Sequence, residues 1–210
     1  MAGYVSEAVI RRLPRYYRHL KELEAEGVKQ ISSQELGKRM KLTASQIRQD
    51  INCFGGFGRQ GYGYDVPELK EHMAAILGVD QVHRMIIVGA GNIGRAVALS
   101  DSFPSNGFET IAMFDTDPAK IGGSIGGIPV LDIGAVTDFL SQNAVDIAVL
   151  AVPIDTAQAV ADVLCANGVR AIWNFVPVDL KLPPETKVVS VHLDEGLEIL
   201  SFKMKYKENA

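Results

Sequence analysis

Two hydrophobic periodicities divide the chain. Residues 6–26 carry apolar side chains at three- and four-residue spacings, which predicts an amphipathic helix that ends at Gly27. Pro14 lies inside this pattern, either in the first turn of the main helix or at a kink in a longer one. Beyond residue 82, short apolar runs alternate with helical patterns, which predicts a parallel sheet with helices on both faces. Strands are expected at 85–88, 110–114, 128–130, 146–152, 171–176 and 187–191, and helices at 92–99, 133–141 and 155–167.

Two short helices are expected after Gly27, each opened by a capping box. The boxes are Ser32–Glu35 and Thr43–Gln46. A short helix, a tight turn and a second short helix are the ingredients of a helix-turn-helix, although many such pairs are purely structural. Small and hydrogen-bonding side chains on the second helix are of the kind that contacts base edges in a major groove. They are Ala44, Ser45, Gln46, Arg48, Gln49 and Asn52.

A glycine-rich segment follows, in which glycine alternates with aromatic or polar residues over residues 54–64. Arg59 and Gln60 lie at its centre. Directly after a helix-turn-helix, such a segment resembles the wing of a winged helix, whose tip arginine could contact phosphate or enter a minor groove. The alternative is a flexible glycine loop without a partner. A further helix begins at 65–68, and a domain boundary is expected at 78–81.

Charge is distributed unevenly along the 210 residues. The net charge is −4, but residues 1–64 hold 11 Lys/Arg against 6 Asp/Glu, and residues 65–210 hold 10 against 19. Such a split favours two domains with different partners, the basic one suited to a polyanion. The first helix adds a basic face that includes Arg12. The DNA-binding prediction therefore comprises Arg12, Ala44, Ser45, Gln46, Arg48, Gln49, Arg59 and Gln60.

The candidate cofactor chemistry lies in residues 85–96, where an apolar strand runs into a glycine turn and a helix. Gly89 permits the turn, Gly91 lets backbone approach a pyrophosphate, and Gly94 lets helix and strand pack closely. Asp115 ends the next apolar run, 24 residues after Gly91, where an acidic residue would hold an adenosine ribose. A purely structural glycine turn is the alternative. With the turns after two later strands, the predicted cofactor residues are Gly89, Ala90, Gly91, Asn92, Ile93, Gly94, Asp115, Thr116, Asp117, Val152, Pro153 and Phe175.

Other classes of protein are disfavoured by what the chain lacks. No apolar run approaches the roughly 20 residues that span a bilayer, and the first residues lack the plan of a signal peptide, so we expect a cytoplasmic protein without a membrane partner. Cys53 and Cys165 form no metal-ligand or redox spacing, so no metal site is predicted. The last segment, 194–204, predicts a capped helix whose apolar side chains pack either on its own sheet or on a partner subunit.

In the order of its motifs, the chain resembles the Rex family of redox-sensing transcriptional repressors almost from end to end. The resemblance rests on residues 12–18, 43–50, 54–58, 61–64, 89–96, 114–118 and 174–177. It implies a homodimer with winged-helix heads on palindromic operator DNA, a Rossmann domain that distinguishes NADH from NAD, and a C-terminal helix exchanged between subunits. It also implies that NADH releases the protein from DNA. The fold expected is α/β, with a winged helix at 1–80, a Rossmann domain at 81–192 and a dimerisation helix at 193–210.

The resemblance also points to a switch between cofactor and DNA. Some family members couple a tyrosine and an aspartate of the Rossmann domain to an arginine of the first domain. By register these positions are Ser100, His192 and Arg18, of which Arg18 alone matches. A protonated His192 would repel NAD⁺, so the affinity ratio of NAD⁺ to NADH is expected to depend on pH. The alternative is a purely structural histidine at this position. Asp115 should favour NAD(H) over NADP(H), and no arginine follows it to bind a 2′-phosphate.

Two rival functions are weighed against the repressor. An NAD-dependent dehydrogenase would need a substrate domain and a proton-transfer group, but residues 82–192 are used by the sheet, so no catalytic residue and no enzymatic activity is predicted. The second rival is a Rossmann domain for another nucleotide, such as coenzyme A, with a first domain that serves only dimerisation.

Overall fold

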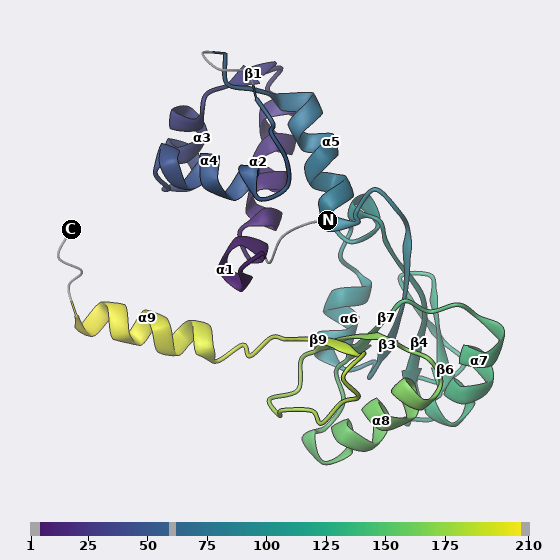
Figure 1. Cartoon of the computed structure of the whole chain (residues 1–210). Helices are drawn as coiled ribbons and strands as arrows, with labels where there is room; N and C mark the ends of the chain where they lie inside the picture. Colours follow the sequence, from purple (N-terminus) through teal and green to yellow (C-terminus); the bar gives the residue numbers. More distant parts are fainter. Residues whose placement is uncertain (1–4, 59–61, 207–210) are drawn as a thin grey trace. The chain divides into compact units, whose positions relative to one another are not determined.

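The computed structural model describes residues 5–58 and 62–206, which belong to two compact units (Figure 1). The first unit is Met1–Gln81 and the second is Val82–Ala210. Each has its own hydrophobic core, so each is described by itself.

The first unit consists of helices and a two-stranded ladder. Its elements are α1 (Glu7–Ile10), α2 (Leu13–Ala25), β1 (Gln30–Ile31), α3 (Ser33–Met40), α4 (Ala44–Asn52), β2 (Tyr64–Asp65) and α5 (Val66–Leu77). The single helix expected over 6–26 is two helices, and Pro14 lies in the first turn of the second. Proline fits there because the first N–H groups of a helix have no intrahelical partner.

Helices α3 and α4 form the predicted helix-turn-helix. The turn is tight because Lys41 adopts a left-handed conformation (φ 56°) and Gly37 lets the Leu42 carbonyl approach, where a Cβ would lie 2.6 Å from that oxygen. Ser32 and Glu35 form the expected capping box. The second capping box is only half present: Thr43 caps the Gln46 N–H, but the Gln46 amide bonds Asp50 instead of closing the box.

The glycine-rich segment returns the chain to β1. Strand β2 pairs antiparallel with β1, with Ile31 opposite Tyr64. Gly63 (φ 80°) permits this return, since a Cβ there would overlap the Ile31 carbonyl. The two-stranded ladder beside a helix-turn-helix confirms the winged-helix class; Arg59 and Gln60, the predicted tip, lie outside the described residues.

The second unit is a seven-stranded sheet in the order β5-β6-β4-β3-β7-β8-β9. All neighbours are parallel except β5 and β6. The strands are β3 (His83–Val88), β4 (Phe108–Asp115), β5 (Ser124–Ile125), β6 (Ile128–Asp132), β7 (Ile147–Leu150), β8 (Ala171–Asn174) and β9 (Lys187–Ser190). The chain adds β4 on one side of β3 and later returns to add β7 on the other, which creates a crevice at the carboxyl ends of β3 and β7.

Helices cover both faces of this sheet, which confirms the doubly wound prediction (Figure 1). Alternate residues of β3 point to opposite faces: Ile86 and Val88 belong to one core and Met85 and Ile87 to the other. The first core includes side chains of α7 (Val136–Gln142) and α8 (Ile154–Ala166), and the second includes α6 (Asn92–Ala98). Two short 3-10 turns, η1 (Pro104–Asn106) and η2 (Ile133–Ala135), complete the unit's connections.

The chain ends in α9 (Glu195–Lys205), whose residues are all exposed. Its Asp194 makes no side-chain cap, contrary to the capped helix expected. Packing of α9 on its own sheet is excluded for the single chain, because Leu197 is 69% exposed and Phe202 63%. No helix among residues 5–58 and 62–206 is long and apolar enough to cross a membrane.

Candidate cofactor pocket and nucleic-acid interface

The glycine turn between β3 and α6 is built by close backbone contacts. Gly89 has a φ of 105°, and a Cβ there would overlap the Ala151 carbonyl of the neighbouring strand end. A Cβ on Gly94 would overlap the Gly89 carbonyl, so helix and turn could not approach. Gly91 differs, because a Cβ there would meet no atom within 4 Å. Gly89 and Gly94 therefore shape the turn, while Gly91 faces open space beside the first N–H groups of α6.

Asp115 closes the turn from the end of β4. Its Oδ2 accepts hydrogen bonds from the Ala90 N–H (2.7 Å) and the Lys120 ammonium (3.1 Å), and its Oδ1 accepts one from the Asp117 N–H (2.9 Å). Burial alone would raise the pKa of this carboxyl, but these donors hold it below its ordinary value. Asp115 is therefore an anion, and its Oδ1 retains a lone pair for a further donor.

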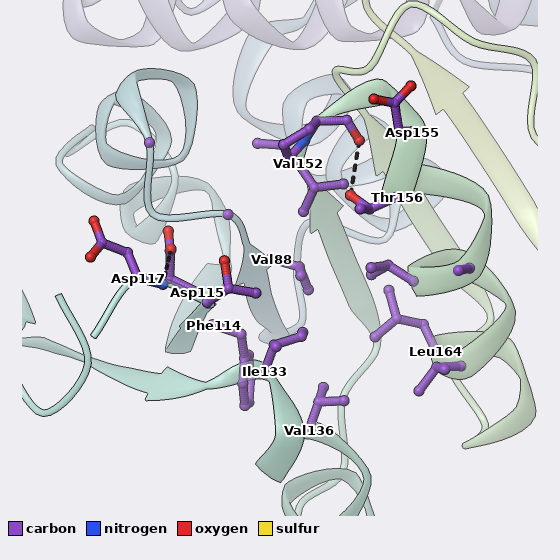
Figure 2. Close-up of a pocket in the computed structure, with 18 of the residues that line it drawn as sticks. Val88, Phe114, Asp115, Asp117, Ile133, Val136, Val152, Asp155, Thr156 and Leu164 are labelled. Atoms are coloured by element: carbon purple, nitrogen blue, oxygen red, sulfur yellow. Dashed lines mark hydrogen bonds between the residues drawn. The ribbon is translucent and has the colours of Figure 1, made fainter. Parts of the chain in front are cut away.

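A pocket of about 890 Å³ opens at this carboxyl edge. Figure 2 shows Asp115 and Asp117 on one side, Val152, Asp155 and Thr156 on the other, and apolar side chains such as Val136 at the base. The size is that of a small-molecule or cofactor site. An apolar floor beside the carboxylates of Asp115 and Asp117 suits an adenosine, whose base is flat and whose ribose donates hydrogen bonds.

The predicted cofactor residues divide into those that line the pocket and those that do not. The lining includes Gly89, Gly91, Asp115, Thr116, Asp117, Val152 and Pro153. Ala90, Asn92, Ile93, Gly94 and Phe175 are not part of it. Phe175 packs on Trp173, with ring centroids 4.6 Å apart.

Several pocket residues were not predicted from the sequence. They are Val88, Phe114, Lys120, Ile133, Val136, Ala151, Asp155, Thr156, Ala159, Val160, Val163 and Leu164. Ile133 and Thr156 follow parallel strands, so the carboxyl-edge rule that selected Val152 could have found them. Lys120 also follows a parallel strand, β4, and the turn at Asp117 places it in the pocket.

The exposed face of α4 forms the candidate nucleic-acid interface. Ser45, Arg48, Gln49 and Asn52 are exposed and lie three, four and seven residues apart, so they share one side of the helix. Ile47 and Ile51 are fully buried on the other side. Of the residues that the sequence places on this helix surface, Ala44 and Gln46 are only half-exposed. The Arg48 guanidinium is held by the Ser33 hydroxyl at 3.0 Å.

A buried carboxylate joins α4 to the start of α2. Asp50 is fully buried and accepts two hydrogen bonds from Arg12, at 2.7 and 2.8 Å. It also accepts one from the Tyr16 hydroxyl (2.9 Å) and one from the Gln46 amide (3.0 Å). Two predicted DNA-binding residues, Arg12 and Gln46, are therefore oriented by this one carboxylate.

The three switch candidates have their own local partners. Arg18 is 65% exposed and lies 3.9 Å from Glu22. The Ser100 hydroxyl bonds that of Ser102 at 2.8 Å. His192 Nδ1 lies 2.7 Å from a Glu195 carboxylate oxygen, which raises the pKa of the imidazole. Its Nε2 is buried without a hydrogen-bond partner in the part of the chain that the structure describes.

Two family models match successive parts of the chain. Residues 4–52 match the family described as "Putative DNA-binding protein N-terminus", and residues 80–178 match the CoA binding domain. The first covers α1 to α4, and the second covers the sheet from β3 to β8.

Curated relatives match almost the whole chain. The Redox-sensing transcriptional repressor Rex of Thermoanaerobacter sp. (strain X514) is 50% identical over 204 residues, which cover 97% of this chain and 91% of that protein. The Rex protein of Clostridium beijerinckii is 49% identical over 205 residues, which cover 98% and 97%. The chain belongs to the Rex family of redox-sensing transcriptional repressors.

Solved structures of RSP, a Rex-family repressor, have the same fold. Its complex with β-NAD⁺ and operator DNA matches with a TM-score of 0.93 and 49% identity, over 97% of this chain and 94% of that one. Its complex with β-NADH matches with a TM-score of 0.89 and 46% identity, over 97% and 95%. Membership of the Rex family confirms the resemblance and makes the chain a regulator of transcription rather than an enzyme.

Proposed function

We propose that this Rex protein represses transcription as a homodimer on palindromic operator DNA and leaves the DNA when NADH fills the pocket at Asp115. The observation that carries the proposal is the presence, in one chain, of an exposed polar α4 face and a pocket with an apolar floor, a glycine turn and the carboxylate of Asp115. The function is expected in the cytoplasm, where operator DNA and both cofactor forms occur together.

DNA recognition is assigned to the α4 face and the wing. Ser45, Arg48, Gln49 and Asn52 would contact base edges, and Arg59 with Gln60 would contact the backbone or minor groove. The division of the chain into a DNA-binding part (1–80), a cofactor part (81–192) and a dimerisation helix (193–210) follows the same assignment.

Cofactor binding is assigned to the pocket and the glycine turn. The pyrophosphate would lie over Gly91, the adenosine ribose would donate to Asp115, and the base would lie on the apolar floor. The match to a CoA binding domain makes coenzyme A the second candidate. Coenzyme A carries a phosphate on its adenosine ribose, which the anionic Asp115 would repel, so NAD(H) is favoured.

A second copy of the chain is the partner assigned to α9. Leu197, Leu200, Phe202 and Met204 are between 53% and 81% exposed, and Val189 on the edge strand β9 is 64% exposed. Apolar surface on this scale marks an interaction site, and a two-fold dimer would match a palindromic operator. Exchange of α9 between subunits would bury these side chains.

The proposal is tested by a gel shift on a palindromic operator titrated with NADH, NAD⁺ or coenzyme A. NADH should release the DNA at concentrations where the other two do not. The variant Asp115→Ala should bind operator normally and require much more NADH for release. Release by coenzyme A instead of NADH would support the second candidate, and indifference to all three would refute a sensor.

The dimer is tested by sedimentation of Leu200→Asp, with the exposed Glu198→Gln on the same helix as control. The first should give monomers that lose the operator, and the second should sediment as wild type. A monomeric wild-type protein that binds operator tightly would contradict the assignment of α9.

A further inference from the structure

Lys120 lies beside Asp115 in the pocket. Neither the glycine turn nor the spacing rule that identified Asp115 predicts it. Its ammonium nitrogen lies 3.1 Å from Asp115 Oδ2 and 3.5 Å from Asp117 Oδ2. The Lys120 side chain is 37% exposed and lines the pocket with both carboxylates.

The backbone holds Lys120 at this point. The Asp117 carbonyl accepts hydrogen bonds from the N–H groups of Lys120 (3.0 Å) and Ile121 (3.2 Å), and an Asp117 carboxylate oxygen accepts one from Ala119 (3.0 Å). This tight turn folds the chain back towards β4, so the lysine meets the carboxylates because of the turn.

The ion pair has a consequence for ligand selection. Asp115 Oδ2 already accepts two donors, so a ribose hydroxyl is left with Oδ1, which accepts only the Asp117 N–H. The three side chains together carry one net negative charge. A 2′-phosphate would therefore meet two carboxylates, but also an ammonium that could bind it if it were not held by Asp115.

We propose that Lys120 is a specificity-determining residue, and that its engagement by Asp115 sets how strongly the pocket rejects a 2′-phosphorylated adenosine such as that of NADP(H). Asp115 then acts twice: it accepts the ribose hydroxyl, and it holds the Lys120 ammonium, which would otherwise bind a phosphate there. The inference rests on the proposed function, because it takes NAD(H) as the cofactor.

A double-mutant cycle tests the coupling, with NADH and NADPH affinities measured by cofactor fluorescence. Asp115→Ser should weaken NADH and strengthen NADPH, which changes the ratio of the two affinities by about tenfold or more, because the freed ammonium makes a charge-assisted hydrogen bond. In Asp115→Ser with Lys120→Met, the gain for NADPH should be lost. Lys120→Met alone should weaken NADPH more than NADH.

Two further variants control for misfolding. Asp115→Asn keeps a hydrogen-bond acceptor for the Ala90 N–H while removing the charge, so it should shift the affinity ratio in the same direction as Asp115→Ser. Lys181→Met, the same change at an exposed lysine of this unit, should leave both affinities unchanged.

Two results would overturn the inference. A gain in NADPH affinity that persists in the double variant would mean that another group binds the phosphate. An unchanged ratio of NADH to NADPH affinity in Lys120→Met would mean that the lysine does not affect cofactor selection. A wild-type protein that binds neither cofactor would refute the proposed function as well, which separates failure of the inference from failure of its premise.

Discussion

Asp50 is a position where the helix-turn-helix should be highly sensitive to a single substitution, because its buried carboxylate accepts hydrogen bonds from three side chains. Asp50→Ala would remove a fully buried carboxylate and leave three donors without their acceptor: the Arg12 guanidinium, the Tyr16 hydroxyl and the Gln46 amide. Of these, Tyr16 is itself fully buried, so water cannot replace the lost bond there. Arg12 is 21% exposed and can recover part of its hydration.

The size of the destabilisation follows from the difference in burial between Tyr16 and Arg12. Removing one partner of a buried ion pair costs about 3–5 kcal/mol. The partial exposure of Arg12 places Asp50→Ala towards the lower end, at about 3 kcal/mol, which is a large fraction of the roughly 5–15 kcal/mol that stabilises a protein. If the first unit unfolds by itself, its thermal midpoint should fall by roughly 12–24 °C.

The assay must report on the first unit alone. Hydrogen exchange measured by mass spectrometry does so, because peptides of α2 and α4 should lose protection while those of β3 and β7 keep theirs. Fluorescence of Trp173, which lies in the second unit, should remain that of wild type. Operator affinity should fall with the loss of protection in α4.

The matched control is Glu26→Gln, which breaks the exposed pair with Arg39 in the same unit. That pair also has two hydrogen bonds, at 3.1 and 2.7 Å, so it differs from Asp50–Arg12 chiefly in burial. Glu26→Gln should leave the hydrogen exchange and the thermal midpoint of the first unit unchanged. Equal effects of the two substitutions would refute the reasoning from burial.

The same carboxylate predicts sensitivity to acid. Burial would raise the pKa of Asp50, but hydrogen bonds from Arg12, Gln46 and Tyr16 outweigh it and hold the pKa below its ordinary value. The stability that Asp50 contributes is therefore present above its unfolded pKa of about 3.9 and is lost as the pH falls through the lower folded value. In acid titrations wild type should lose this advantage over Asp50→Ala.

Three other predictions concern cofactor, DNA and switch. Gly91→Ala should keep the wild-type thermal midpoint but lose at least about tenfold in NADH affinity, or roughly 1.4 kcal/mol, whereas Gly94→Ala should also lower the midpoint. Calorimetry measures the midpoint and fluorescence titration the NADH affinity. Full NADH affinity in Gly91→Ala would contradict the assignment of the pyrophosphate to this glycine. Arg48→Ala should cost about 1–3 kcal/mol of operator binding and relax specificity at one position of each half-site, and a uniform loss across operator variants would indicate a phosphate contact instead. The pKa of His192 is raised by its bond to Glu195, so the stability from this pair is present at low pH and lost as the pH rises through that pKa. NMR should show a lower His192 pKa in Glu195→Gln. The preference for NADH over NAD⁺ should fall in wild type between about pH 6 and pH 8, and a constant preference would contradict a role of this ring in cofactor discrimination.

Features with local signals could be predicted from the sequence. The glycine turn and Asp115 could be predicted together, because the turn that contacts a pyrophosphate and the acidic residue that contacts the ribose occur at a characteristic spacing. The structure brings Ala90 and Asp115 into direct contact. The helix-turn-helix was equally visible through Ser32 and Thr43 as caps. Both predictions depend on residues close in sequence or on strand order alone.

Features that depend on tertiary contact could not be predicted. The Gln46 amide satisfies the capping-box pattern, yet Asp50 offers it a buried charged acceptor, which outweighs the cap. Asp50 itself meets Arg12 across 38 positions of sequence. Lys120, by contrast, reaches Asp115 through the local turn at Asp117, and the pair Asp117-Pro118 is a sequence signal for such a turn. The hairpin of β5 and β6 did have a signal, the pair Gly126-Gly127 at positive φ.

In the proposed function, DNA binding by this chain responds to the ratio of NADH to NAD⁺. This response is tested most directly by operator occupancy at a constant sum of NADH and NAD⁺, with only their ratio varied. Occupancy should fall steeply as the NADH share rises, and Asp115→Ala should flatten the response. Occupancy that stays constant across all ratios, while both cofactors bind, would contradict the proposed function.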